Sequence, residues 1–306
     1  MSQHFPIVIS VATFRRPELL EKLLVSLKNQ QGINPEEFHV VVVDNDAECS
    51  ASNTVAKFSE MATYVSQPMP GIAAARNAGI DEAENHAPSA LVFVDDDEVV
   101  PETWLAELLA AWRTTGADVV TGPVAYQMPP GTDQLKRAVH FFMTIEHPNL
   151  GRVSDVATNN TLVSSKWFYE SPRLRFSERY SHTGGSDLEL FHRLQRHGGF
   201  CVWASKARVD EVVPESRANL KWVRQRDLRN GQLQARLRME LHNEPTRNIA
   251  VLGVMRVIKG AALFVLSAPT SDRRIKAWHI LEKGRGYVRA SRGRLYNEYL
   301  DARKSN

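Results

Sequence analysis

The sequence predicts an α/β fold with a mostly parallel sheet, followed by a basic α-helical C-terminal region. Over the first 125 residues, short runs of β-branched residues, such as HVVVV at 39–43, alternate with stretches of helical periodicity. Continuous apolar strands separated by helices of roughly 10–15 residues are typical of a parallel sheet that is covered on both faces. Beyond Pro214 the pattern is almost wholly helical and rich in Arg.

The predicted elements of the sheet domain follow one another along the chain. Strands are expected at 6–12, 39–43, 62–65, 90–94 and 118–124, and helices at 17–30, 50–60, 72–84 and 101–114. Pro17 and Pro101 fall at helix starts, where the missing N–H of proline has no helical partner to lose. The stretch 126–215 is irregular, with a helix from about Ser186 and short strands near 200–203 and 207–209. We therefore predict a sheet domain at 1–215 and a basic helical region at 216–306.

The net charge of +3 conceals two unlike parts of the chain. Residues 1–216 contain 18 Lys and Arg against 28 Asp and Glu, whereas residues 217–306 contain 20 against 7. The small overall charge argues against a nucleic-acid-binding protein, and the split indicates that the two parts meet different partners. Two cysteines, Cys49 and Cys201, are too few for a disulfide scaffold and predict a reducing cytosol. The N-terminus has no basic region of the kind that begins a signal peptide.

Polar residues follow the first, second and fourth predicted strands, at the edge where parallel sheets bind ligands. Thr13 and Arg16 follow the first strand, Asp44 ends the second, and four carboxylates, Asp95–Glu98, follow the fourth. Crowded carboxylates repel one another, and a hard divalent cation offsets that repulsion. A solvated acidic turn that caps the next helix is the alternative. The Asp-x-Asp-x-Val pattern also matches the nucleophile motif of haloacid-dehalogenase-type phosphatases, with Asp95 as nucleophile.

Two glycine-containing segments are further candidates for the site. Gly71–Gly79 begins an Ala-rich helix on which Arg76 offers a planar fork for a phosphate or carboxylate, although tight helix packing explains the alanines equally well. Gly184 and Gly185 precede a helix that starts with Ser186 and Asp187. Asp187 is either a helix cap or a carboxylate at the mouth of the sheet that acts as a general base.

The order of these segments resembles glycosyltransferase family 2, with the GT-A fold, in its bacterial exopolysaccharide and lipopolysaccharide type. The resemblance covers about residues 5–230, and its most specific parts are Asp95–Glu98 and Gly-Gly-Ser-Asp at 184–187. It implies an inverting transferase that moves a sugar from a nucleotide-diphosphate donor, with a UDP-sugar favoured, to a hydroxyl of a glycan or lipid-linked acceptor. A non-catalytic nucleotide-sugar-binding protein on the same fold is the alternative.

The resemblance also implies roles for individual residues. The donor nucleotide would be bound by Thr13, Arg16, Asp44, Arg76, Asp95 and Asp96. Mg²⁺ or Mn²⁺ would be bound by Asp97 and Asp95, and Asp187 would be the general base. Two positions depart from the family pattern, because Ser186 replaces an acidic residue and Val212 replaces a His. Glu211 or water would then take the place of that His at the metal.

The basic region contains an apolar stretch, 249–266, whose 18 residues are near the minimum for crossing a bilayer. Arg256 and Lys259 lie in its middle, and on a helical wheel they share a stripe with Gly253 and Gly260. We therefore predict a helix that lies in the membrane interface, with the flanking Arg residues facing anionic lipid. The expected location is the cytoplasm, at the inner face of the membrane. Packing against the sheet domain or in a homo-oligomer is the alternative.

Overall fold

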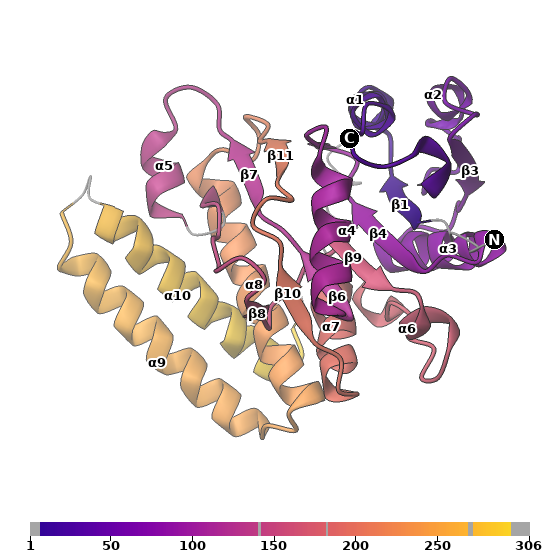
Figure 1. Ribbon diagram of the computed structural model, residues 1–306. Coiled ribbons are helices and arrows are strands. Elements are labelled where there is room, and N and C mark those ends of the chain that lie inside the picture. Colours follow the sequence, from indigo (N-terminus) through magenta and orange to yellow (C-terminus); the bar gives the residue numbers. More distant parts are fainter. Residues whose placement is uncertain (1–6, 140–141, 182, 269–271, 295–306) are drawn as a thin grey trace. The chain divides into compact units, whose positions relative to one another are not determined.

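The computed structural model describes residues 7–139, 142–181, 183–268 and 272–294 (Figure 1). The chain divides into two compact units. The first consists of the chain as far as Ala125, Thr144–Ser181 and Gly185–Glu211, and the second of Tyr126–Met143, His182–Gly184 and the chain from Val212. The sequence pattern predicts a boundary at 215/216 and gives no sign that 126–143 groups with the C-terminal helices.

An eight-stranded sheet with the order β3-β2-β1-β4-β9-β6-β10-β8 forms the centre of the first unit. Its parallel half consists of β1 (Ile7–Thr13), β2 (Phe38–Asp44), β3 (Ala62–Ser66) and β4 (Ala90–Val94). The other half contains β6 (Val119–Thr121), β8 (Arg152–Val153), β9 (Asn160–Ser164) and β10 (Cys201–Trp203). In this half β6 and β10 are parallel, whereas β9 is antiparallel to β4 and β6. The predicted mostly parallel α/β sheet is confirmed.

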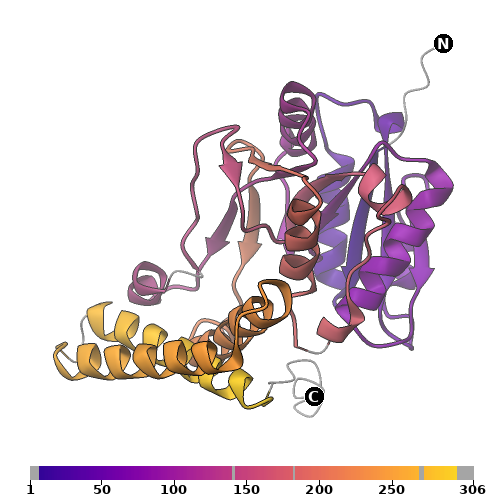
Figure 2. The same cartoon turned by 90° about the horizontal axis from the view of Figure 1, so that it is seen from below.

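Helices and short 3-10 turns cover both faces of this sheet (Figure 1 and Figure 2). Alternate residues of β1 enter two different cores, because Ile9 and Val11 belong to one cluster and Val8 to the other. Both faces are therefore apolar, which explains the continuous β-branched runs. The elements of this unit are α1 (Pro17–Lys28), η1 (Pro35–Glu37), α2 (Ser52–Ala56), α3 (Ile72–Ala83), η2 (Glu84–His86), α4 (Trp104–Thr115), α6 (Lys166–Tyr169), η4 (Glu178–Tyr180) and α7 (Ser186–Arg196).

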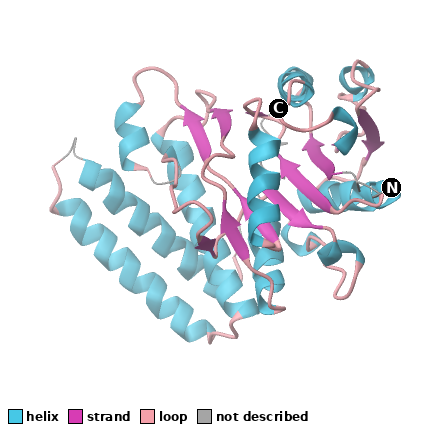
Figure 3. Ribbon diagram, in the orientation of Figure 1, coloured by secondary structure: helices cyan, strands magenta, loops and turns pink. Residues whose placement is uncertain are grey.

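The predicted strand at 118–124 is wrong as a single element, because the chain changes sheets within it. Figure 3 draws all strands in magenta, and Figure 1 labels β6 and β7 as separate strands. β6 ends at Thr121, and β7 (Val124–Gln127) belongs to a second sheet with β11 (Val209–Val212) and β5 (Glu98–Val99), in the order β5-β11-β7. Gly122 and Pro123 separate β6 from β7. A Cβ on Gly122 would collide with the carbonyl oxygen of Ala207, and Pro123 has no N–H for a ladder.

A buried amide stabilises the connection between these sheets. Asn160 is 1% exposed; its Oδ1 accepts a hydrogen bond from Trp104 Nε1 at 2.8 Å. Its Nδ2 donates to the carbonyl oxygens of Ala207 at 2.6 Å and Pro123 at 3.1 Å. One side chain thus satisfies three buried polar groups.

We expect Asn160→Ala to lower the free energy of unfolding by about 2–4 kcal/mol, because Trp104 Nε1 and the Ala207 carbonyl each lose a buried hydrogen bond, whereas the Pro123 carbonyl keeps the one from Val209 N. Urea unfolding followed by circular dichroism measures this change. Asn53→Ala, at an exposed position of α2, is the matched control and should change stability by less than about 0.5 kcal/mol. Equal losses in the two variants would contradict a structural role for Asn160.

The second unit is helical, which confirms the helical C-terminal region. It contains α5 (Asp133–Ala138), α8 (Leu220–Leu241), α9 (Thr246–Val265) and α10 (Asp272–Ser291). α8 is capped by Asn219, whose Oδ1 accepts a hydrogen bond from Trp222 N at 2.9 Å. Glycines bring the backbones of the long helices together, because a Cβ on Gly260 would lie 2.6 Å from Leu281 N and one on Gly286 would collide with the carbonyl oxygen of Leu228.

Candidate active site

The carboxyl ends of β1, β2 and β4 meet at one edge of the parallel half of the sheet. Thr13 and Asp44, the last residues of β1 and β2, are register partners. β1 also pairs in parallel with β4, and Thr13 Oγ1 donates a hydrogen bond to Asp96 Oδ2 at 2.7 Å. The structure therefore brings together the polar segments that follow these strands.

Arg16 is the counter-ion of the acidic turn after β4. Its Nη1 donates to Asp96 Oδ1 at 3.0 Å and to Asp97 Oδ2 at 2.9 Å. Asp96 is 5% exposed, and this burial raises its pKa to about 6, although the charge of Arg16 opposes the shift. Arg16 holds these carboxylates in the structure, so its contact with a donor stays a prediction.

Arg76 lies on α3 beside the same turn. Its Nη2 is 3.3 Å from Asp95 Oδ1, and its guanidinium lies over the Phe176 ring at 5.6 Å from the centroid. The Arg76 side chain is 11% exposed and that of Asp95 is 43% exposed. The helix is placed by Gly71, whose φ of 148° favours glycine and where a Cβ would lie 2.9 Å from Ser181 Cβ. A nearly buried cation is thus held next to an accessible carboxylate.

Asp187 lies in the first turn of α7 and is partly exposed. The helix follows Gly184 and Gly185, whose φ angles of 74° and 91° lie in the left-handed region. Partial desolvation raises the pKa of Asp95, Arg76 opposes this, and the charges of Asp97 and Asp187 raise that pKa further. The structure therefore places Asp187 within electrostatic range of the acidic turn. Ser186, which replaces an acidic residue in the family pattern, is 1% exposed.

Glu98, the last carboxylate of the acidic turn, is buried beside Glu211, and the sequence predicts no individual role for Glu98 within that cluster. Glu98 is 1% exposed; its Oε2 accepts a hydrogen bond from Asp95 N at 2.9 Å. Glu211 is the register partner of Glu98 across β5 and β11. Burial raises the pKa of Glu98 well above its usual range, and the charges of Asp95 and Glu211 add to this. Strand alternation buries Glu211 and leaves Val212 58% exposed.

Asp44 makes the local hydrogen bonds of a turn carboxylate. It has no exposed surface, and its oxygens accept from Asp46 N at 3.1 Å and Ala51 N at 2.8 Å. Tyr64 Oη also donates to Asp44 Oδ2 at 3.2 Å. In the structure Asp44 therefore stabilises the turn that follows β2. Its predicted contact with a nucleobase stays a prediction.

Asn45 is a site-shaping residue that the sequence analysis did not single out. Its Nδ2 donates to the carbonyl oxygens of Gln67 and Met69, each at 2.7 Å. Its Oδ1 accepts from Gly71 N at 2.9 Å. Asn45 therefore fixes the chain that leads into α3. A polar amide directly after a buried strand was the available signal, since such residues organise turns.

The carboxylates of the acidic turn suit a divalent cation whose coordination is completed by the substrate. Within the described part of the chain, no three His, Cys, Asp or Glu side chains form a preformed metal site. Mg²⁺ in phosphate-binding sites is usually held by one or two carboxylates together with substrate phosphates. Asp95 is accessible, and Asp97 is 14% exposed with Oδ2 bound to Arg16. These two carboxylates, in a turn with excess negative charge, satisfy that requirement.

The mostly parallel sheet and the acidic turn at its edge agree with the predicted glycosyltransferase class. The sequence matches the family described as glycosyl transferase family 2 over residues 8–171, and glycosyl transferase family group 2 over residues 90–279. The chain belongs to glycosyltransferase family 2.

Similar proteins agree with this assignment. The chain is 35% identical over 275 residues to the succinoglycan biosynthesis protein ExoM of Rhizobium meliloti (strain 1021), which covers 87% of this chain and 86% of that protein. It is 29% identical over 237 residues to the hyaluronan synthase of Pasteurella multocida, covering 65% of this chain and 24% of the synthase.

A solved structure has the same fold. S. aureus TarS 1–349 in complex with UDP-GlcNAc matches with a TM-score of 0.54 and 14% identity, over 95% of this chain and 93% of that one. The GT-A fold and the bacterial polysaccharide type of transferase are thereby confirmed. The chain is a glycosyltransferase, and these matches give no support to the phosphatase alternative.

Proposed function

We propose that the protein is an inverting glycosyltransferase that moves a sugar from a UDP-sugar to a hydroxyl of a glycan or lipid-linked acceptor. The observation that carries this proposal is the placement of Asp187 within electrostatic range of Asp95, which Arg76 contacts. Asp187 is partly exposed, and the donor diphosphate would lie beside the acidic turn. UDP is favoured because the structurally similar TarS is described in complex with UDP-GlcNAc.

The donor nucleotide and its diphosphate would lie along the edge formed by β1, β2 and β4. Arg76 suits the diphosphate best, because its guanidinium is held in place by Asp95 and Phe176 and keeps some exposure. Thr13 and Asp96 hold each other by a buried hydrogen bond and shape the floor of this region. Contacts of the nucleotide with Arg16, Asp44 and Asp95 complete the proposed donor site.

Mg²⁺ or Mn²⁺ would be held by Asp97 and Asp95 together with the donor. When bound, such an ion neutralises negative charge that develops on the departing diphosphate. Arg76 supplies a fixed positive charge from the protein for the same purpose. Glu98 accepts the backbone N–H of Asp95 and so fixes the turn that carries the ligands.

Asp187 performs the proton transfer in the proposed reaction. Its carboxylate takes the proton of the acceptor hydroxyl while that oxygen attacks the anomeric carbon. The bond between the anomeric carbon and the diphosphate oxygen breaks on the opposite face, and the diphosphate leaves with the electron pair. The configuration at the anomeric carbon is therefore inverted.

A thermal-shift panel of nucleotide-sugars with and without Mn²⁺ tests this function. A ligand that binds only the folded state at 100 times its Kd adds about 2.7 kcal/mol of stability. We expect UDP-sugars to raise the Tm in the presence of Mn²⁺ and to have a much smaller effect in EDTA. An unchanged Tm with every UDP-sugar in Mn²⁺ would contradict the proposed donor class.

The two units would have different roles in the proposed enzyme. The first unit would carry the transfer reaction, and the basic helical unit would place the protein on the cytoplasmic face of the membrane, where lipid-linked acceptors are found. The similarity to a succinoglycan biosynthesis protein supports an acceptor of the cell envelope. A homo-oligomer stays a prediction.

A further inference from the structure

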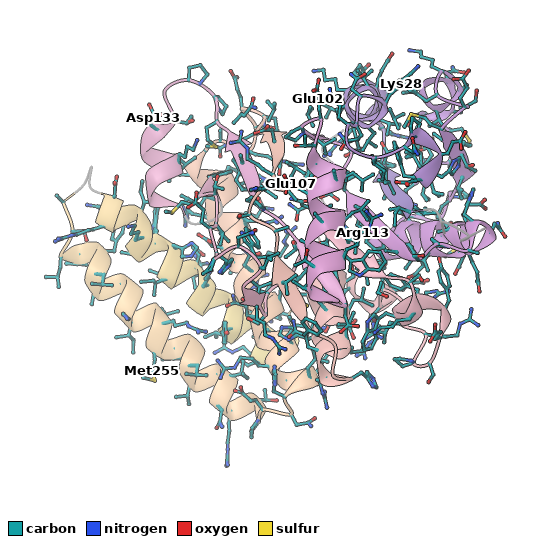
Figure 4. The ribbon with its side chains drawn as sticks, in the orientation of Figure 1. Lys28, Glu102, Glu107, Arg113, Asp133 and Met255 are labelled. Atoms are coloured by element: carbon teal, nitrogen blue, oxygen red, sulfur yellow. The ribbon has the colours of Figure 1, made fainter. Side chains whose placement is uncertain are left out.

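One face of α9 is apolar and exposed from Val251 to Val265. The exposed fractions are 58% for Val251, 61% for Met255, 63% for Ile258 and 80% for Val265. These residues are spaced by about whole turns, so their side chains share one face of the helix. Met255 projects from α9 on the side away from α10 (Figure 4). Among the described residues, α9 is the one helix long and apolar enough to cross a membrane, with a mean hydropathy of 1.7.

The opposite face of α9 is held against α10. A Cβ on Gly253 would lie 2.8 Å from Val288 Cγ2, and one on Gly260 would lie 2.6 Å from Leu281 N. The Arg256 guanidinium lies over the Tyr287 ring at 4.1 Å from its centroid. The sequence predicts that Lys259 shares a stripe of the helix with Gly253, Arg256 and Gly260. Lys259 is exposed, whereas the other three residues of that stripe lie against α10. Because these contacts leave no room for rotation, the apolar face stays turned outward.

The charges around this face are mostly positive. α9 contains no Asp or Glu, and residues 246–294 contain 11 Lys and Arg against 2 Asp and Glu. One of the two acids, Glu282, is 3% exposed and paired with Arg224 and Arg285. Exposed cations of α9 and α10 are Arg247, Lys259, Arg273, Lys276, Arg285 and Arg289. A second copy on this face would bring like charges together, whereas an anionic surface complements them.

α9 is not free to cross a bilayer by itself. α10 runs alongside it (Figure 1 and Figure 2) and carries charged residues along its length, from Arg273 to Arg289. If α9 spanned the membrane, these charges would be drawn into the hydrocarbon, where a charged side chain is strongly unfavourable. A helix with one apolar face and basic flanks instead lies at the level of the headgroups.

We propose that the exposed face of α9 docks on a bilayer of anionic phospholipid, with the helix axis parallel to the membrane plane. Val251, Ile258 and Val265 would enter the boundary between headgroups and acyl chains, and the flanking cations would contact lipid phosphates. This inference deepens the membrane placement proposed above and does not depend on the transfer reaction.

Flotation of the full chain with lipid vesicles tests the proposal. The wild type is expected to float with phosphatidylcholine vesicles that contain phosphatidylglycerol, and to bind pure phosphatidylcholine vesicles and high-salt samples much less. Ile258→Asp should reduce the vesicle-bound fraction by about tenfold, since it places a carboxylate in the docking face. Val25→Asp, at a 47% exposed position of α1, adds the same charge elsewhere and should float like the wild type.

Three outcomes would overturn the proposal. The first is no flotation of the wild type with phosphatidylglycerol, and the second is equal flotation of Ile258→Asp and Val25→Asp. The third is a wild-type dimer that Ile258→Asp converts to a monomer while flotation is unchanged, which would make this face an interface between copies. Asp187→Asn separates this test from that of the reaction, because it should float normally and fail in transfer.

Discussion

Asp187→Asn is expected to lower sugar transfer by about 10²–10⁴-fold and to leave the Kd of the donor nearly unchanged. The amide cannot accept the proton of the acceptor hydroxyl, although it occupies the same volume in the first turn of α7. Donor binding should survive because Arg76 and the acidic turn hold the diphosphate in the proposed site, whereas Asp187 acts on the acceptor hydroxyl. Steady-state release of UDP, with a titration of UDP binding alongside, measures both quantities.

Asp81→Asn is the matched control for this variant. Asp81 lies on α3 with its side chain 65% exposed, and it pairs with Arg175 at 2.9 Å. Exposed pairs of this kind contribute little to stability, so turnover should stay at the wild-type level. Near-normal turnover in Asp187→Asn would remove this residue from the role of general base.

Asp97→Asn is expected to weaken Mn²⁺-dependent UDP binding by at least about tenfold. The neutral amide is a poorer ligand for a hard cation, and it also weakens the pairing with Arg16, which now binds Asp97 Oδ2 at 2.9 Å. Changes even to the partners of metal ligands cost about 10–100-fold in metal affinity. Isothermal titration with UDP in Mn²⁺ and in EDTA measures the effect.

In EDTA the Asp97→Asn variant and the wild type should bind UDP with similar, weak affinity. Asp81→Asn again serves as control and should keep the full response to Mn²⁺. If the wild type binds UDP equally well in Mn²⁺ and in EDTA, the assignment of Asp97 and Asp95 to a metal is wrong.

The parallel half of the sheet could be predicted because its signal is local. Each strand, such as β2, is a short β-branched run whose two faces are both buried, and a helical stretch follows it. β9 could not be predicted, because its antiparallel place between β4 and β6 depends on partners far away in the sequence. The division of 118–124 depends on the contact of Gly122 with the Ala207 carbonyl, which is equally distant.

The candidate site shows the same limit. The edge that joins Thr13 with Asp96 follows from the rule that strands of a parallel sheet end together, and the structure has that contact. The pairing of Glu98 with Glu211 depends on the small second sheet, which the hydrophobic periodicity of the sequence does not predict. Asn45 links β2 to the start of α3 through a loop whose path only the folded chain defines.

The stereochemistry of the sugar product tests the central claim most directly. The full chain is incubated with an α-linked UDP-sugar and Mn²⁺, and proton NMR records the anomer that first appears on the acceptor, or as free sugar where water is the acceptor. A single displacement assisted by Asp187 predicts the β-anomer as the first product, with UDP released in equal amount. First appearance of the α-anomer would contradict an inverting transfer with Asp187 as its base.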